Sequence, residues 1–366
     1  MKRLKWSAGA TVCCLALCAL SFGQSLPDDS TGAMRLLGLK GHYGFVIVHS
    51  RDLVPVRHSN PRGLEFDWAW QQSSRKAWEA CHCYPRLGAA LTLWDYDQPD
   101  ILGYGATGLF YVEPQFAPWR QLSFSVRAGM GLSYQTRPYD PMSNPFNLSY
   151  STHVAVPLQL GGTLHWRLAP QWLLDATVVY NHFSNGGIRE PNKGINWPTA
   201  ALGVARYFAP PTFIDRGKRS WREDRAPQSR LDVAFFVGFK EPRSKLFLIS
   251  PGIEVKASRQ IARLHALTLG GEFMYDNARR FRIAQAGREE GPESGGLALG
   301  HEFLLGRFLF GQQIGAYVYK PYRVGDDFYQ RYNLMYRASQ RLSAGISLKG
   351  HRHVADFGDF RVAISW

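Results

Sequence analysis

The chain has 366 residues, of which 45% are hydrophobic and 14% aromatic, and its formal net charge at pH 7 is +14. Beyond the N-terminal segment no run of eighteen apolar residues occurs, which excludes a transmembrane helix there. A disulfide scaffold is also excluded, because three of the five cysteines lie at or before Cys18 and only Cys81 and Cys83 follow.

The N-terminus has the pattern of a cleaved secretory signal peptide. Three basic residues within the first five positions precede an apolar stretch that runs to Leu20, and small residues follow near Gly23. We therefore predict a signal peptide over residues 1–23 and an N-terminal extension over residues 24–40. Because the chain is exported and carries no recognisable nucleic-acid-binding motif, we do not expect it to bind nucleic acid.

Apolar and polar residues alternate with a period of two in much of the remaining chain. From Leu122 to Tyr134 the even positions are apolar and the odd positions are polar or small, and residues 154–168 repeat the pattern. Such stretches are about twice as long as an average soluble strand and match strands that cross a bilayer. The last strand ends on Trp366, which resembles the assembly signal of bacterial outer-membrane barrels. We predict an all-β fold, a transmembrane antiparallel β-barrel of the outer-membrane type, in preference to a soluble sandwich.

The pattern indicates about 14–16 strands. They are expected near 42–50, 63–71, 84–96, 102–116, 121–136, 153–168, 172–184, 198–208, 231–241, 246–260, 264–276, 295–306, 307–319, 328–339, 341–350 and 357–366. With both chain ends in the periplasm, the connections at 117–120, 169–171, 261–263 and 340 become short periplasmic turns. The connections at 137–152 and 277–294 then become long outer loops, the asymmetry that is typical of such barrels.

Residues 209–230 do not fit this alternation of short periplasmic turns and long outer loops, because a basic stretch of that length would be an unusually long periplasmic loop. We predict that it links two halves of the chain, residues 41–208 and residues 231–366. Two architectures satisfy this division. One is a single barrel of about 14–16 strands, and the other is an eight-stranded barrel followed by a second β module.

The most informative stretch is residues 181–196, Asn-His-Phe-Ser-Asn-Gly-Gly-Ile-Arg-Glu-Pro-Asn-Lys-Gly-Ile-Asn. His182 and Ser184 lie two positions apart at the end of a predicted strand, so their side chains point to the same face. That face also holds Tyr180 and Val178, and the pair therefore ends an apolar row at the outer rim of the barrel. An imidazole beside a hydroxyl is the minimum apparatus for nucleophilic acyl transfer.

This stretch resembles the active-site segment of the outer-membrane lipid A 3-O-deacylases, a PagL-like group of acyloxyacyl hydrolases. That family has a His-x-Ser-Asn-x-Gly core and then a Pro-Asn-x-Gly stretch, which residues 182–187 and 191–194 match. The resemblance covers residues 41–208 approximately. The second half of the chain is additional to the small family barrel.

The resemblance implies a serine esterase that removes an ester-linked acyl chain from lipid A of lipopolysaccharide. Ser184 would be the nucleophile and His182 its general base. The side chain of Asn185 and the backbone N–H of Gly187 would form the oxyanion hole. No metal and no organic cofactor are implied.

The third catalytic position departs from the family pattern. The best-known members have a Glu at the position that Asn196 occupies here. An Asn can orient a histidine, but it cannot offer a charge to the imidazolium that forms during the reaction. Glu190 lies in the same loop and is the alternative acid.

The charge of the chain agrees with an anionic lipid as partner. Without the three basic residues of the signal peptide, 40 basic residues stand against 29 acidic ones. We predict a location in the bacterial outer membrane, and the sequence predicts no oligomeric state. The rival interpretations are a porin-like channel and a structural outer-membrane barrel, each with a vestigial His-Ser segment.

Three weaker patterns could also carry chemistry. Residues 58–61, His-Ser-Asn-Pro, repeat part of the main motif, and residues 81–83, Cys-His-Cys, have metal-binding residue types. His351, His353 and Asp356 lie together in the last predicted outer loop. Solvated loop residues are the simpler interpretation of each pattern, and we predict no metal site.

Overall fold

The computed structural model describes residues 33–366 apart from 218–226, 244–245 and 353. The predicted signal peptide, residues 1–23, lies outside the described residues. So does the first part of the predicted extension, up to residue 32.

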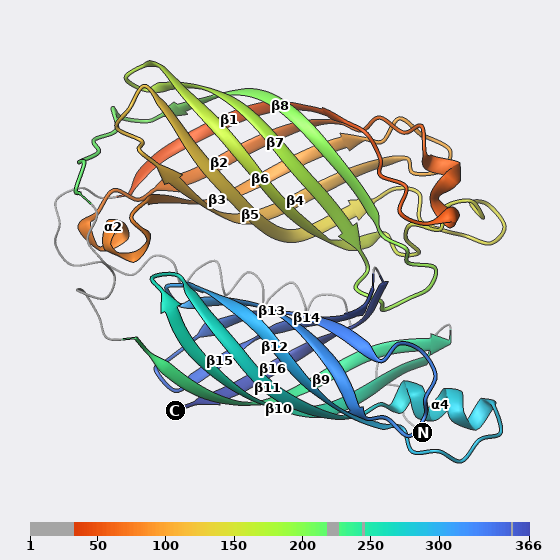
Figure 1. Ribbon diagram of the computed structural model, residues 1–366. Coiled ribbons are helices and arrows are strands. Elements are labelled where there is room, and N and C mark those ends of the chain that lie inside the picture. Colours follow the sequence, from red (N-terminus) through yellow and green to blue (C-terminus); the bar gives the residue numbers. More distant parts are fainter. Residues whose placement is uncertain (1–32, 218–226, 244–245, 353) are drawn as a thin grey trace, which may run out of the picture.

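The described residues form sixteen antiparallel strands, which close into two barrels of eight strands each (Figure 1). Barrel 1 consists of β1 (Met34–Gly44), β2 (Arg62–Gln71), β3 (Tyr84–Asp95), β4 (Tyr104–Phe116), β5 (Leu122–Gln135), β6 (Val154–Ala169), β7 (Trp172–Ser184) and β8 (Ile195–Tyr207). Barrel 2 consists of β9 (Ser229–Arg243), β10 (Leu246–Ala262), β11 (His265–Tyr275), β12 (Glu293–Leu305), β13 (Phe308–Tyr319), β14 (Phe328–Arg337), β15 (Leu342–His351) and β16 (Val354–Ser365). Three helical segments, η2 (Arg51–Val56), α2 (Arg75–Cys81) and α4 (Asn277–Gln285), lie in the connections.

The all-β antiparallel class is thus confirmed, and the strand total falls in the predicted range. The strands do not form one barrel, however, because β8 returns to β1 before β9 begins, with Leu36 opposite Tyr207. In the same way β16 closes on β9, with Asp232 opposite Ser365. The structure therefore has the alternative architecture, an eight-stranded barrel followed by a second β module.

β1 begins at Met34, inside the segment that was expected to be an N-terminal extension. The sequence pattern missed this start because the inward face of β1 carries a charged residue. Lys40 points into barrel 1, where its Nζ lies 3.3 Å from Glu65 Oε1. The extension that precedes the barrel is correspondingly shorter than predicted.

The outer walls of both barrels are apolar. Val178 and Leu202 in barrel 1 are 66% and 68% exposed, and the alternate residues of their strands point inward. Other exposed apolar residues are Phe66, Trp68, Leu93, Phe110, Leu160, Phe235, Leu269, Leu299, Ile314 and Phe360. An apolar outer wall of this kind suits contact with lipid tails. Among the described residues no helix has the length and apolar character needed to cross a membrane.

The interior of barrel 1 is filled by buried charged side chains. The Arg127 guanidinium lies 2.8 Å from Glu65 Oε1, 2.8 Å from Asp67 Oδ2 and 2.7 Å from Glu113 Oε2. The same network includes Lys40, Arg86, Tyr111, His165 and Asp175. An eight-stranded barrel is just wide enough inside for its own side chains, and ion pairs occupy this one.

Barrel 2 is filled in the same manner. Arg331 lies 2.6 Å from both Glu272 Oε2 and Asp359 Oδ2, and Arg361 lies 2.7 Å from Glu254 Oε2. The described strands therefore do not provide the single wide barrel on which the porin-like interpretation depended.

The connections differ between the two ends of the barrels. At one end, called the turn end, residues 117–121, 170–171 and 263–264 make short turns. At the other end, called the loop end, the long connections include those at 136–153 and 276–292. These short and long connections are the ones that the sequence pattern predicted. Figure 1 shows α2 and the C-terminus at the turn end and α4 at the loop end.

The first part of the predicted linker packs over the turn end of barrel 1. The ring of Phe213 lies 5.6 Å from that of Tyr84, and Trp78 Nε1 donates a hydrogen bond to the carbonyl of Gly217 at 3.1 Å. Trp119 adds a further ring 5.7 Å from Trp78. Of the predicted linker, residues 209–217 and 227–230 are described, and Phe213 in the former packs against the aromatic residues at the turn end of barrel 1.

Cys81 and Cys83 form a disulfide with Cα atoms 5.1 Å apart. Such a short bridge needs a sharp bend, and His82 supplies it with a left-handed backbone at φ 52°. The Cys-His-Cys metal interpretation is wrong, because the two sulfur atoms are bonded to each other.

Candidate active site

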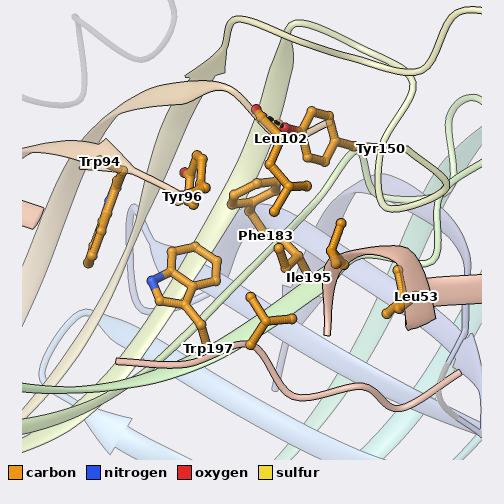
Figure 2. Packing of buried hydrophobic residues seen from close by; sticks show 11 residues of the cluster. Leu53, Trp94, Tyr96, Leu102, Tyr150, Phe183, Ile195 and Trp197 are labelled. Carbon is orange, nitrogen blue, oxygen red and sulfur yellow. Dashed lines mark hydrogen bonds between the residues drawn. The ribbon is translucent and has the colours of Figure 1, made fainter. Parts of the chain in front are cut away.

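The strand that carries the His-Ser pair is anchored by the residue between them. Phe183 is fully buried and points into an aromatic cluster that closes the loop end of barrel 1 (Figure 2). Its ring lies 5.1 Å from that of Tyr150 and 5.3 Å from that of Trp197. Because side chains alternate along a strand, the inward Phe183 directs His182 and Ser184 to the outer face.

His182 has a hydrogen-bonded partner on the neighbouring strand. Asn196 of β8 lies opposite His182 in the strand register, and its Oδ1 is 2.6 Å from His182 Nδ1. An amide oxygen only accepts, so Nδ1 carries the proton and the other ring nitrogen, Nε2, is a proton acceptor. This is the tautomer that a general base for a serine requires.

Asn196 in turn contacts a histidine that sequence reasoning did not select. Asn196 Nδ2 lies 3.0 Å from His49 Nδ1, and His49 Nε2 lies 3.0 Å from the carbonyl oxygen of Lys193. His49 comes just after β1, and the chain there continues beside β8, with the Ile47 N–H bonded to the Asn196 carbonyl at 2.8 Å. A single histidine in a predicted strand carries no local signal of this role.

Ser184 lies at the end of β7 and is 7% exposed. Its Oγ accepts a hydrogen bond from the Gly186 N–H at 3.3 Å. Within the described part of the chain no hydrogen bond joins Ser184 to His182. Catalytic hydrogen bonds are often absent without substrate and form in the complex, so the two side chains remain a candidate pair.

The two expected oxyanion donors bind within their own loop. Asn185 Nδ2 donates to the carbonyl of Arg189 at 2.6 Å and to Ser151 Oγ at 3.3 Å, and the Gly187 N–H donates to Asn185 Oδ1 at 3.1 Å. An oxyanion role for these groups thus requires them to exchange partners when a substrate enters.

Glycines set the path of the site loop, residues 185–194. Gly187 and Gly194 have φ values of 78° and 69°, in the left-handed region that favours glycine. A Cβ atom at Gly194 would lie 2.8 Å from His182 Cε1. The loop therefore passes directly against the imidazole ring, which only a glycine permits.

Among the described residues Glu190 makes no hydrogen bond to His182. It is exposed, and its Oε2 accepts from the Asn192 N–H at 3.0 Å, while Asn192 Oδ1 accepts from the Asn185 N–H at 2.9 Å. Glu190 thus stabilises the loop, and Asn196 is the partner that the fold brings to the imidazole.

The outer wall of β6 and β7 is apolar next to the His-Ser pair, on the side toward the turn end. In the register of β6 with β7, Leu158 lies opposite His182 and Leu160 opposite Tyr180. Leu158, Leu160 and Val178 are all exposed on the outer wall. A hydrocarbon chain lying along this wall would place its head at the His-Ser pair.

The repeated motif at residues 58–61 does not form a second site. Ser59 Oγ donates to the carbonyl of Tyr96, and His58 Nε2 lies 2.8 Å from Arg57 Nε. The two side chains therefore have separate local partners.

Of the three residues near the C-terminus that have metal-binding side chains, His351 and Asp356 are described. His351 Nδ1 lies 3.8 Å from Asp356 Oδ2, and His353 lies outside the described residues. No group of three or more potential metal ligands occurs in the part of the chain that the structure describes.

Two family models match the chain. Residues 62–205 match the lipid A 3-O-deacylase (PagL), and residues 229–366 match the acyloxyacyl hydrolase, C-terminal domain. The first match includes His182, Ser184 and Asn196. No curated protein matches the chain.

Solved structures that match the chain include the following three. Neisserial surface protein A is 8% identical, with 48% of this chain and 97% of that chain covered and a TM-score of 0.33. The outer membrane enzyme PagL is 14% identical, with 45% and 97% covered and a TM-score of 0.33. A triple mutant of Rhodopseudomonas blastica porin is 11% identical, with 91% and 100% covered and a TM-score of 0.21.

Proposed function

Because the chain belongs to the lipid A 3-O-deacylase family, we propose that it is an outer-membrane serine esterase that removes an ester-linked acyl chain from lipid A. Ser184 is the proposed nucleophile and His182 its general base. The site would lie at the outer-leaflet rim of barrel 1, where the substrate ester is found.

The observation that carries this proposal is the contact of 2.6 Å between His182 Nδ1 and Asn196 Oδ1. Because His182 Nδ1 is bonded to Asn196, Nε2 is left as a base on the face of the strand that also carries Ser184. If the ring proton of His182 were on Nε2 instead of Nδ1, His182 could not accept the proton of Ser184, and the hydroxyl would not be activated.

The reaction would follow the usual two steps of serine esterases. His182 Nε2 takes the proton of Ser184 as Oγ attacks the ester carbonyl, and the tetrahedral intermediate expels the sugar alkoxide, which receives that proton. Water then hydrolyses the acyl-enzyme with the same base and releases a 3-hydroxy fatty acid. The Gly187 N–H and Asn185 Nδ2 are the proposed donors to the oxyanion, each typically contributing about 3 kcal/mol.

The outer wall explains how a lipid would reach this site. The acyl chain can lie along Leu158, Leu160 and Val178 while it stays in the leaflet, so no route through the barrel interior is needed. Export of the protein would depend on the predicted signal peptide, residues 1–23, and the basic excess of the chain would favour the lipid A phosphates.

The test is mass spectrometry of lipid A from cells that express the protein, beside cells that express Ser184→Ala. We expect lipid A to lose the mass of one hydroxyacyl chain only when Ser184 is intact. Heat-modifiable migration on gels would show that both barrels are folded. Identical lipid A from the two strains would contradict the proposal.

A further inference from the structure

The orientation of the Asn196 amide determines which nitrogen of His182 carries the proton. With Asn196 Oδ1 facing it at 2.6 Å, His182 Nδ1 donates and Nε2 is free to accept. If the amide turned over, its NH₂ group would face Nδ1, and the ring proton would have to move to Nε2. A His182 protonated at Nε2 cannot take a proton from Ser184.

His49 is placed to prevent this rotation. Its Nε2 lies 3.0 Å from the carbonyl oxygen of Lys193, and its Nδ1 lies 3.4 Å from that of Ile47. Both oxygens only accept, and we assign the His49 proton to Nε2, which has the shorter contact. His49 Nδ1 is then an acceptor, 3.0 Å from Asn196 Nδ2. We infer that His49 is a positioning residue, which fixes the amide of Asn196 and thereby the protonation state of His182. The inference rests on the proposed function.

Protonation of His49 would reverse this arrangement. A His49 cation donates from both nitrogens, so it would pair with Asn196 Oδ1 and turn the NH₂ group toward His182. The titratable groups around His49 include His182, across the Asn196 amide, and Lys193, whose carbonyl oxygen contacts His49 and whose Nζ lies 3.2 Å from Asp52 Oδ2. Activity would therefore require both imidazoles to be neutral.

The test is a series of variants at position 49 that differ in hydrogen bonding. His49→Gln keeps an acceptor, His49→Met offers almost none, and His49→Lys offers donors alone. We expect kcat within about twofold of the parent for Gln, a loss of about tenfold for Met and about 100-fold for Lys, with KM for lipid A unchanged.

A second readout does not depend on catalysis. In protein with ¹⁵N-labelled histidine, NMR should show His182 protonated at Nδ1 in the parent and in His49→Gln, and at Nε2 in His49→Lys. Equal effects of Gln and Lys on kcat and on the tautomer would overturn the inference. If the parent has no deacylase activity, the proposed function fails, yet the NMR spectra still decide the role of His49.

A separate observation concerns the backbone of barrel 2, which meets the site loop at Gly187. A Cβ atom at Gly187 would lie 3.0 Å from the carbonyl oxygen of Ala355 and 2.9 Å from that of Asp356, at the start of β16. Two backbones approach this closely only when one of them is glycine. We propose that barrel 2 holds the tip of the site loop in its catalytic conformation.

The side chain of Asp356 is paired with a lysine inside barrel 2. The pairing of β15 with β16 shifts register at a bulge here, so Asp356 has no partner in β15. Its carboxylate Oδ1 is instead 2.8 Å from Lys240 Nζ, which also lies 2.9 Å from Asp276 Oδ2 at the start of α4. Lys240 thus fixes the backbone that meets Gly187.

Lys256 provides a matched control. It is also a buried lysine of barrel 2, and it pairs with Glu302 at 3.1 Å and Asp232 at 3.6 Å, nearer the turn end. We expect Lys240→Met to raise amide hydrogen exchange in residues 185–194 about tenfold and to lower kcat about tenfold at constant KM. We expect Lys256→Met to change neither quantity.

Asp356→Ala is a second variant, which leaves Lys240 paired with Asp276. It should also raise exchange in residues 185–194, while the exchange of the barrel 1 strands stays unchanged. The proposal is wrong if the two lysine variants behave alike, or if neither Lys240→Met nor Asp356→Ala changes exchange in the loop. The hydrogen-exchange measurement tests this proposal even if the parent has no deacylase activity.

Discussion

Replacing His182 by alanine is expected to lower kcat for lipid A deacylation by roughly 10⁴-fold, since it removes the base that takes the Ser184 proton. Loss of the serine or the histidine of a full triad costs about 10⁶-fold. A smaller loss is expected here, because Asn196 sets the tautomer of His182 but offers no charge to its cation. The measurement is the single-turnover rate on purified lipid A in mixed micelles.

Because the nucleophile and the base act together, the falls in kcat caused by replacing each of them should not multiply in the double variant. The double variant His182→Ala/Ser184→Ala is expected to react no more slowly than Ser184→Ala alone. A further fall in the double variant would mean that His182 acts independently of Ser184. A wild-type rate in His182→Ala would exclude the histidine as the base.

The second large effect that we expect is a loss of stability when a buried charge inside barrel 1 is removed. Arg127→Met is expected to lower the free energy of unfolding by about 3–5 kcal/mol, because removal of one partner leaves buried charges without compensation. Three carboxylates, those of Glu65, Asp67 and Glu113, lose a direct partner at once. Urea unfolding in lipid vesicles, followed by tryptophan fluorescence, measures the change.

Arg35→Met is the control for this variant, since Arg35 belongs to the same barrel and its side chain is exposed. We expect its unfolding free energy to stay within about 0.5 kcal/mol of the parent value. A similar small change in Arg127→Met would show that the interior charges of barrel 1 adapt to the loss, against the expectation from their burial.

The outer walls could be predicted from sequence because each strand shows its lipid face locally. The even positions from Leu122 to Tyr134 are apolar, and β5 covers this stretch. The start of β1 escaped prediction because the ion pair of Lys40 with Glu65 depends on a strand that is distant in sequence. Alternation identifies a strand, but it does not say which strand closes the barrel.

The same distinction applies to the candidate site. The side-chain direction of His182 and Ser184 follows from their spacing of two, and the left-handed loop follows from its glycines. The approach of His49 to Asn196 joins residues 147 positions apart, and it depends on how the chain beyond β1 continues beside β8. The bend at His82 that allows the disulfide also had no local signal, since no glycine marks it.

Closure of both barrels has a consequence for how the protein can associate. In the described strands β1 pairs with β8 and β9 pairs with β16, so neither sheet presents an unpaired edge. A neighbouring chain therefore cannot extend either sheet through backbone hydrogen bonds. Any assembly of these barrels, with each other or with further copies, must use side chains on the outer walls or the connecting loops, as the meeting of Gly187 with Asp356 does.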